Sequence, residues 1–271
     1  MIKNEFKIFL TAVLFYTRIP CPKWVDHSAD YLNKSARYLP LIGWIYGGVS
    51  CFVLLLSLLL NLSPEIAVVL SMVSGILLTG AFHEDGFADV CDGFGGGWKK
   101  QKILDIMKDS RVGAYAVIGL VLLLLLKFLL ILKLTNLILN STYANPALKP
   151  IKLLFVLIVS HSLSRYAAIS IAFTDTYARE DADSKSVSAV GSFTRIEILV
   201  GLFFTLLPLG FFAVHHLPIL GILIPVILLR IYLASYFRKW IGGYTGDCLG
   251  AAQQICEVVI YLSFIALWNY I

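Results

Sequence analysis

The residues best suited to chemistry are aspartates in the segment 83–93, which reads HEDGFADVCDG. Asp85, Asp89 and Asp92 are spaced i, i+4, i+7, so on an α-helix they would lie within about 60° of one another. Three carboxylates on one helical face repel one another unless a cation lies between them. Hard oxygen ligands suit Mg²⁺, Mn²⁺ or Ca²⁺ rather than zinc. The spacing therefore predicts a site for a hard divalent cation on a helix.

A second acidic pair follows a glycine-rich segment at 93–97. Asp105 and Asp109 are spaced i, i+4, which predicts a second acidic helical face. Two such faces could hold one or two divalent ions, and ions of this kind commonly bridge a substrate pyrophosphate. A solvated charged face beside a membrane is the ordinary explanation of a single acidic pair. Five aspartates in two helical registers favour the metal site instead.

Basic residues and glycines that could bind phosphate accompany these acids. Lys108 and Arg111 adjoin the second acidic pair. Arg165 lies inside a long apolar segment, where an Arg costs roughly 2.5–3.5 kcal/mol on insertion scales and needs a carboxylate or a substrate phosphate as partner. Gly246 belongs to the glycine-rich turn 242–250, whose N–H groups could bind an anion at the start of a helix.

Asp247 lies in the same turn and has two interpretations. It could cap the helix that follows, or it could belong to the site. On that helix Asp247, Gly250, Gln254 and Glu257 share one face, which continues into an apolar segment. This pattern favours a functional face that points into a helix bundle.

Three other basic residues have weaker interpretations. Lys127 and Arg230 lie within apolar segments. Their long side chains could lie along the helix and place the charged end at the membrane surface. Arg179 belongs to the polar segment 175–195, which indicates a surface loop with room for a contact to substrate.

The remainder of the chain is strongly apolar. Of the 271 residues, 59% are hydrophobic and 14% are charged, and the mean hydropathy is +0.83. One soluble core of this size cannot bury so much apolar surface, so the composition excludes a soluble enzyme. Alternating β-barrel patterns are absent, and the composition predicts an all-α polytopic membrane bundle. The net charge of +5 fits basic loops at a membrane face, and no nucleic-acid partner is expected.

About seven apolar segments are long enough to cross a bilayer, which takes about 20 residues each. The seven are 40–60, 65–82, 113–134, 151–173, 197–214, 217–237 and 252–270. The shorter segment 6–16 predicts an N-terminal interfacial or re-entrant helix. No linker divides the chain, so we treat residues 1–271 as a single integral-membrane domain.

Seven spans divide the loops between two sides of the membrane. The segments 1–39, 83–112, 174–196 and 238–251 share one side and carry sixteen of the 22 Lys and Arg residues. The other side and its margins carry three, and three more fall within the spans. The positive-inside rule places the side with the aspartates in the cytoplasm.

Some well-known catalytic motifs are absent from the sequence, which leaves fewer possible reaction types. The chain has no GxxxxGK[ST] motif, so a P-loop ATPase is not supported. It also has no Ser-x-x-Lys or GxSxG nucleophile motif. A direct in-line phosphoryl-type transfer, without a covalent enzyme intermediate, is the simpler hypothesis.

Taken in order, these motifs resemble the cobalamin synthase family, also called the adenosylcobinamide-GDP ribazoletransferases. The matching segments are 17–22 (TRIPCP), 82–93 (FHEDGFADVCDG), 107–113 (MKDSRVG), Ser164-Arg165 and 245–251 (TGDCLGA). They cover almost the whole chain, and the three acidic segments together are highly specific. The chain has Lys108 where the family often has Arg, and Phe87 where it often has Leu. Glu84 often corresponds to an apolar residue, so it has little weight.

The resemblance implies a reaction. The adenosylcobinamide-phosphate group would pass from adenosylcobinamide-GDP to a hydroxyl of α-ribazole or α-ribazole 5′-phosphate. The products would be adenosylcobalamin, or its 5′-phosphate, and GMP, which is the nucleotide-loop assembly step of cobalamin biosynthesis. The resemblance also implies a requirement for Mg²⁺ and a multi-pass location in the cytoplasmic (inner) membrane, with the active site facing the cytoplasm. A homo-oligomer is compatible with these expectations.

The candidate residues then take expected roles. The expected metal ligands are Asp85, Asp89, Asp92, Asp105 and Asp109. The groups expected to bind substrate phosphate are Lys108, Arg111, Arg165 and Gly246. The groups expected to act in catalysis are Asp85, Asp89, Arg111, Arg165 and Asp247. One of the carboxylates would serve as the base.

Two other functions fit part of the pattern. CDP-alcohol phosphotransferases of lipid head groups also place paired aspartates on membrane helices around divalent metals. Their acidic motif, however, has Ala-Arg where this chain has Ala88-Asp89. A transporter should place its charges near mid-membrane at broken helices, whereas these acids gather at one face.

Overall fold

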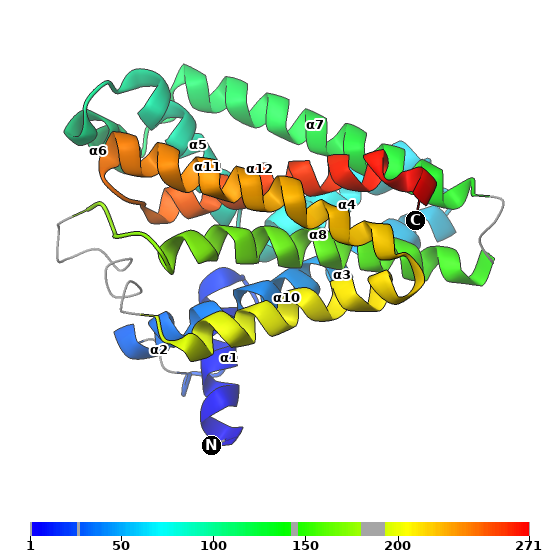
Figure 1. Cartoon of the computed structure of the whole chain (residues 1–271). Helices are drawn as coiled ribbons and strands as arrows, with labels where there is room; N and C mark the ends of the chain where they lie inside the picture. Colours follow the sequence, from blue (N-terminus) through cyan, green and yellow to red (C-terminus); the bar gives the residue numbers. More distant parts are fainter. Residues whose placement is uncertain (1, 26–27, 142–145, 180–192, 271) are drawn as a thin grey trace.

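The protein is a bundle of long helices in the computed structural model (Figure 1). The structure describes residues 2–25, 28–141, 146–179 and 193–270. Within these ranges it has helices and turns and no β-strand beyond one isolated bridge between Tyr177 and Tyr244. The predicted all-α fold is confirmed.

Six helical segments in the described residues are long and apolar enough to cross a membrane. Their main helices are α3 (Leu39–Leu59), α7 (Ala114–Leu139), α8 (Lys149–Ala172), α10 (Arg195–His215), α11 (Leu223–Ile241) and α12 (Gly246–Ala266). The 3₁₀ helix Leu217–Ile222 leads directly into α11 and lengthens that segment. These helices correspond to six of the apolar segments predicted from the sequence, and the chain is a multi-pass membrane protein.

The seventh predicted segment, 65–82, corresponds to the first helix of a broken pair. α4 (Pro64–Thr79) and α5 (Phe82–Gly96) meet at an angle of 88°. Gly80 and Ala81 between them have φ values of 65° and 59°. Left-handed residues cannot continue a right-handed helix, so the chain turns sharply there. The turn separates the acidic helix α5 from the apolar helix α4.

Three shorter α-helices complete the α-helices of the described residues. They are α1 (Ile2–Tyr16), α2 (Ala29–Ser35) and α6 (Lys100–Lys108). α1 confirms the helix predicted at the N-terminus and projects from the side of the bundle in Figure 1.

Helix α12 begins at Gly246, six residues before the apolar segment predicted at 252–270. The Thr245 hydroxyl accepts a hydrogen bond from the Cys248 N–H at 3.3 Å and caps the helix. The helix therefore starts within the glycine-rich turn.

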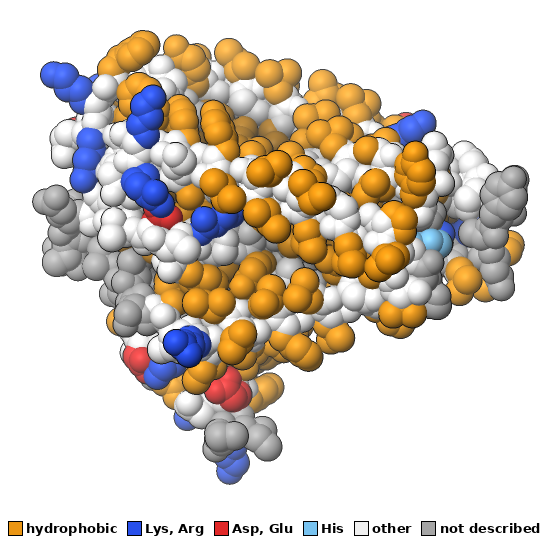
Figure 2. Space-filling model, viewed as in Figure 1, with side chains coloured by type: hydrophobic (Ala, Val, Ile, Leu, Met, Phe, Trp, Pro, Cys, Tyr) orange, Lys and Arg blue, Asp and Glu red, His pale blue; other side chains and the backbone are white. Residues whose placement is uncertain are grey.

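The charged segments gather at one end of the bundle. The ends of α5, α8 and α11 and the starts of α7 and α12 lie at the left in Figure 1, together with α6. Figure 2 shows Lys and Arg side chains over this end and a broad hydrophobic belt over the middle of the bundle. This distribution is typical of a membrane protein with one strongly basic face.

Glycines let two pairs of helices approach closely. A Cβ on Gly43 of α3 would lie 2.5 Å from the His161 carbonyl oxygen of α8. A Cβ on Gly86 of α5 would lie 3.0 Å from the Asp247 Cα of α12, and one on Gly250 would lie 3.1 Å from the His83 oxygen. Small residues of this kind permit close helix packing in membranes. They hold the acidic helix α5 directly against the start of α12.

Candidate functional site

A cavity of about 340 Å³ lies where α5 meets the start of α12. Its polar wall includes His83, Asp85, Arg179, Gly246 and Asp247. The rest of the lining is mostly apolar or aromatic and comes from several elements: Phe15, Tyr16, Leu39, Phe82, Ile169, Phe193 and Tyr244. The cavity thus combines an acidic end with an apolar body, as ligand sites commonly do.

Helix α5 presents two aspartates without a protein partner. Asp85 is exposed and Asp89 is partly buried. Among the described residues, no hydrogen bond or ion pair reaches either carboxylate. Burial disfavours the charge of the Asp89 carboxylate most, and the charges of Asp247, Asp85 and Asp92 repel it, whereas Arg179 attracts it. A bound cation would relieve this repulsion.

Asp92, the third aspartate of this face, has a structural partner. Its carboxylate accepts hydrogen bonds from the Gly113 N–H at 2.6 Å and the Ala116 N–H at 2.9 Å. These N–H groups belong to the start of α7, where Gly113 has no side chain to cap the helix. Asp92 therefore joins α5 to α7 at the edge of a group of carboxylates, Asp85, Asp89, Asp92 and Asp247, that we call the acidic cluster.

The structure distinguishes the two interpretations of Asp247. The cap of α12 is Thr245, and Asp247 lines the cavity instead. Its Oδ2 lies 2.7 Å from Nη2 of Arg179. Asp247 therefore does not cap the helix and lies in the acidic cluster, and its role in the site stays a prediction.

Arg179 reaches this cluster through a short backbone pairing. The Ala178 N–H donates to the Tyr244 carbonyl at 2.8 Å, and the Tyr244 N–H donates to the Thr176 carbonyl at 3.0 Å. A Cβ on Gly243 would lie 2.0 Å from that Thr176 oxygen, so the approach requires glycine. The sequence indicated only a loop around Arg179, because nothing local identifies a pairing between residues so far apart along the chain.

The second acidic pair does not form the predicted helical face. Asp105 is exposed on α6 and accepts a hydrogen bond from Gln101 Nε2 at 2.8 Å. α6 ends at Lys108, and Asp109 is extended, with ψ 123°. The prediction of a shared helical register for these two aspartates is therefore wrong. The physical reason is a local turn, in which the Asp109 carboxylate accepts from both the N–H and the Nε of Arg111.

Arg111 and Lys108 lie on the exposed surface around this turn. The Arg111 side chain is 87% exposed. Its hydrogen bonds and charge lower the pKa of Asp109 from 3.8 to about 2. Lys108 is also exposed. None of these residues lines the cavity in the described part of the chain, and their roles toward metal and phosphate stay predictions.

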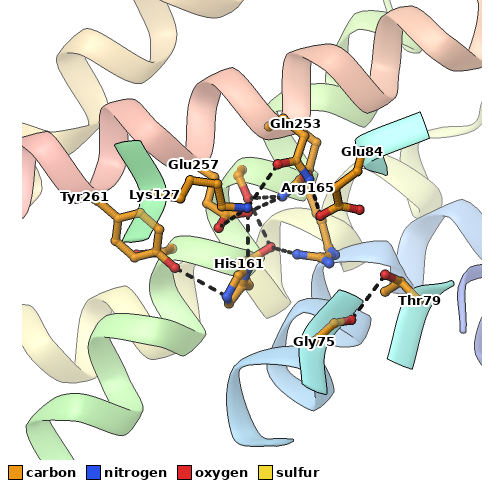
Figure 3. Close-up of polar contacts among 12 residues, drawn as sticks. Gly75, Thr79, Glu84, Lys127, His161, Arg165, Gln253, Glu257 and Tyr261 are labelled. Carbon is orange, nitrogen blue, oxygen red and sulfur yellow. Dashed lines mark hydrogen bonds and ion pairs between the residues drawn. The ribbon is translucent and has the colours of Figure 1, made fainter. Parts of the chain in front are cut away.

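Arg165 is almost completely buried, with 1% of its surface exposed. Its Nη1 donates to the His161 carbonyl at 3.0 Å, and its guanidinium lies 4.8 Å from the centre of the Tyr46 ring. Figure 3 shows it within a group of polar side chains inside the bundle. Arg165 does not line the cavity among the described residues, and its predicted contact with phosphate is untested.

An ion pair in the same group corrects the interpretation of Lys127. Lys127 Nζ lies 2.9 Å from Glu257 Oε1, and both side chains are at most 4% exposed. Lys127 therefore does not extend to the membrane surface, because a carboxylate on α12 neutralises it inside the bundle. Arg230 donates to the Ser170 carbonyl near the end of α8, at 2.6 Å, and its predicted reach to the membrane surface stays a prediction.

The buried polar group also reaches the acidic helix. Gln254 accepts from Lys127 Nζ at 3.0 Å and donates to Glu84 Oε1 at 2.9 Å. Glu84 precedes Asp85 on α5, so these contacts fix the first turn of α5 against α12 (Figure 3). Of the predicted face, Gly250, Gln254 and Glu257 are buried in the bundle, as expected, and Asp247 lines the cavity.

The carboxylates at the cavity fit a cation that takes some of its ligands from the substrate. Among the described residues, no three Asp, Glu, His or Cys side chains form a ready metal site. Mg²⁺, however, is commonly held by one or two carboxylates together with substrate phosphates and waters. The unpartnered carboxylates of Asp85 and Asp89, close to a cavity, meet this requirement.

Comparisons with known proteins agree with this picture. The family model described as cobalamin-5-phosphate synthase matches residues 8–265. A protein named adenosylcobinamide-GDP ribazoletransferase from Shewanella sp. (strain W3-18-1) is 45% identical over 264 residues, which cover 96% of this chain and 94% of that protein.

Proteins of the same name from two other species are similar over almost their whole length. The protein from Shewanella piezotolerans is 43% identical over 263 residues, covering 96% of this chain and 95% of the relative. That from Shewanella amazonensis is 41% identical over 270 residues, covering 98% of both chains. No solved structure matches. The resemblance seen in the acidic motifs is confirmed, and the chain belongs to the cobalamin-5-phosphate synthase family.

Proposed function

We propose that this protein transfers the adenosylcobinamide-phosphate group from adenosylcobinamide-GDP to a hydroxyl of α-ribazole or α-ribazole 5′-phosphate. The products are adenosylcobalamin, or its 5′-phosphate, and GMP. The observation that carries the proposal is the 45% identity to a ribazoletransferase across 96% of this chain. The acidic cavity between α5 and α12 supports it, because its carboxylates could hold the divalent cation that neutralises a diphosphate donor.

The reaction is a displacement at phosphorus. The acceptor hydroxyl oxygen attacks the phosphorus that is attached to cobinamide, and the bond from this phosphorus to the oxygen of GMP breaks. GMP leaves with that oxygen. A carboxylate of the acidic cluster takes the hydroxyl proton.

The negative charge of the donor's diphosphate must be neutralised where the phosphorus is attacked. We propose Asp85 and Asp89 as ligands of Mg²⁺, with Asp92 and Asp247 beside them. Bound Mg²⁺ would neutralise the diphosphate and the departing phosphate. Gly246 lines the cavity at the start of α12, and we propose that its N–H donates to a phosphate oxygen. The apolar body of the cavity excludes water from the attacked phosphorus.

The location of the site follows from the charge distribution. We propose that the basic end of the bundle faces the cytoplasm of the inner membrane, because basic loops are retained on that side. The acidic cluster lies at this end, and both substrates are water-soluble.

A direct assay tests the function. Purified protein in detergent with Mg²⁺ should release GMP from adenosylcobinamide-GDP only when α-ribazole or its 5′-phosphate is present. A CDP-alcohol substrate should give no product, and sealed vesicles containing the protein should show no ion flux. Turnover of the CDP-alcohol without GMP release from the cobinamide donor would overturn the proposal.

A further inference from the structure

Arg179 is the only Lys or Arg that lines the cavity among the described residues. Its side chain is 13% exposed, and Nη2 lies 2.7 Å from Asp247 Oδ2. Its Nε is buried and has no hydrogen-bond partner within the described part of the chain. The guanidinium thus uses one side for Asp247 and leaves a buried donor unsatisfied.

An unsatisfied donor of this kind is costly and suited to an anion. A buried N–H without a partner loses its hydration and gains nothing in return. A guanidinium offers five donors in a rigid fork that matches phosphate oxygens. The other charged groups around the cavity, Asp85 and Asp247, would repel a diphosphate.

We propose that Arg179 binds the diphosphate of the donor and, in doing so, releases Asp247 to the divalent cation. The inference rests on the proposed function for the identity of the donor. Arg179 and the cation then compete for one carboxylate, whereas the donor and the cation support each other. Because coupling between two ligands is reciprocal, the donor should strengthen cation binding as much as the cation strengthens donor binding.

This arrangement predicts effects of opposite sign when Arg179 is removed. Arg179→Ala frees Asp247, so the cation should bind more tightly. The same change removes a charge-assisted contact to the donor, so the donor should bind more weakly. A residue with a purely structural role would weaken both.

The experiment measures the two effects separately. Mn²⁺ binding to the detergent-solubilised protein, without substrate, is followed by the electron paramagnetic resonance of free Mn²⁺. The KM for adenosylcobinamide-GDP is taken from GMP release. Arg179→Ala should bind Mn²⁺ several-fold more tightly and raise the KM by about tenfold or more, with a smaller change in kcat. Arg179→Gln should behave in the same way, and Arg179→Lys should lie between them.

Arg238→Ala is the matched control. Arg238 pairs with Asp175 at 2.6 Å at the same end of the bundle and lies outside the cavity. This variant should keep Mn²⁺ affinity and KM close to those of the wild type. Unchanged or weaker Mn²⁺ binding in both Arg179→Ala and Arg179→Gln would overturn the inference. Wild-type protein that releases no GMP would instead overturn the proposed function.

Discussion

Each aspartate of the acidic segments has different surroundings, and these surroundings divide the aspartates by role. Asp85 and Asp89 have no protein partner in the described residues and lie at the cavity and beside it. Asp92 receives two N–H groups of α7, and Asp109 is held by Arg111. The carboxylates that stay without partners are the ones suited to a cation, because a partnered carboxylate must first give up its hydrogen bonds.

Asp109 provides a prediction about pH. Its pKa is lowered to about 2, so its charge, and any stability that depends on it, is lost only as the pH falls well below 3.8. GMP release by Asp109→Asn should therefore keep the pH profile of the wild type between about pH 5 and pH 9. A shift of the acidic limb in this variant would show that Asp109 titrates in the reaction.

At the scale of elements, the contact between α5 and α12 determines where the carboxylates lie. Gly86 and Gly250 let the two backbones meet, and Gln254 joins Glu84 across the interface. Displacement of α5 by even part of a side chain would move Asp85 and Asp89 away from Asp247. Rates of catalysis are sensitive to small shifts in the positions of the reacting and binding groups.

Gly86→Ala tests the closeness of these helices. The added Cβ would lie 3.0 Å from two backbone atoms of Asp247, so α5 or α12 must move. We expect a loss of stability of about 1–3 kcal/mol and about a tenfold loss of activity.

Gly96→Ala on the same helix is the control. Its Cβ meets only Ile106 Cδ1 at 3.4 Å. It should be neutral or stabilising by up to about 1 kcal/mol. Thermal unfolding in detergent and GMP release measure both variants, and equal behaviour of the two would refute the packing argument.

Much of this arrangement is predictable from local sequence. The apolar lengths predict α3, α7, α8, α10 and α11, and the i, i+4, i+7 spacing predicts the acidic helix α5. Each of these helices is encoded in one continuous segment, by its apolar length or by the spacing of its residues. The family resemblance also follows from short local motifs.

The remainder depends on contacts that no single segment contains. The turn at Gly80 and Ala81 sets α5 at a sharp angle to α4, which the composition of neither segment indicates. Arg179 reaches the site through pairing with Tyr244, and Lys127 is neutralised by a carboxylate on another helix. Asp109 is a separate case, because a local turn with Arg111 follows the end of α6 at Lys108 although the i, i+4 spacing fits a helix.

At the scale of the molecule, buried charges join four helices beneath the cavity. Lys127 of α7 pairs with Glu257 of α12, Gln254 of α12 binds Glu84 of α5, and His161 Nδ1 of α8 lies 3.4 Å from Glu257 Oε2 (Figure 3). Polar contacts inside a membrane bundle link helices that apolar packing alone would not orient. This group therefore supports the geometry of the site from within the membrane.

Removing one charge of the Lys127–Glu257 pair should lower the stability of the protein much more than removing both charges. Lys127→Met leaves Glu257 buried without its cation and should lower the free energy of unfolding by about 3–5 kcal/mol. Glu257→Gln leaves Lys127 buried without its carboxylate and should have a similar effect. The double variant should be more stable than the sum of the two losses predicts. Thermal unfolding in detergent measures all three, and additive losses would show that the ion pair does not couple the helices.

The orientation of the whole bundle is open to a labelling test. Trp98, between α5 and α6, is 81% exposed, and Asn61 lies in the loop between α3 and α4. Each is replaced by Cys in a protein whose partly exposed Cys21 and Cys91 are Ser. A membrane-impermeant maleimide added to intact cells with a permeable outer membrane should label Asn61→Cys and leave Trp98→Cys unlabelled. The reverse pattern would place the site outside the cytoplasm.

The central claim is that phosphoryl transfer occurs at the unpartnered carboxylates of α5. The most direct measurement compares GMP release by Asp89→Asn and by Asp30→Asn at limiting Mg²⁺. Asp30 is exposed on α2 and pairs only with Lys34 in the described structure. The account predicts that Asp89→Asn inserts and unfolds like the wild type but loses activity by about a hundredfold or more, while Asp30→Asn stays close to normal. Near-normal turnover by folded Asp89→Asn at limiting Mg²⁺ would contradict it.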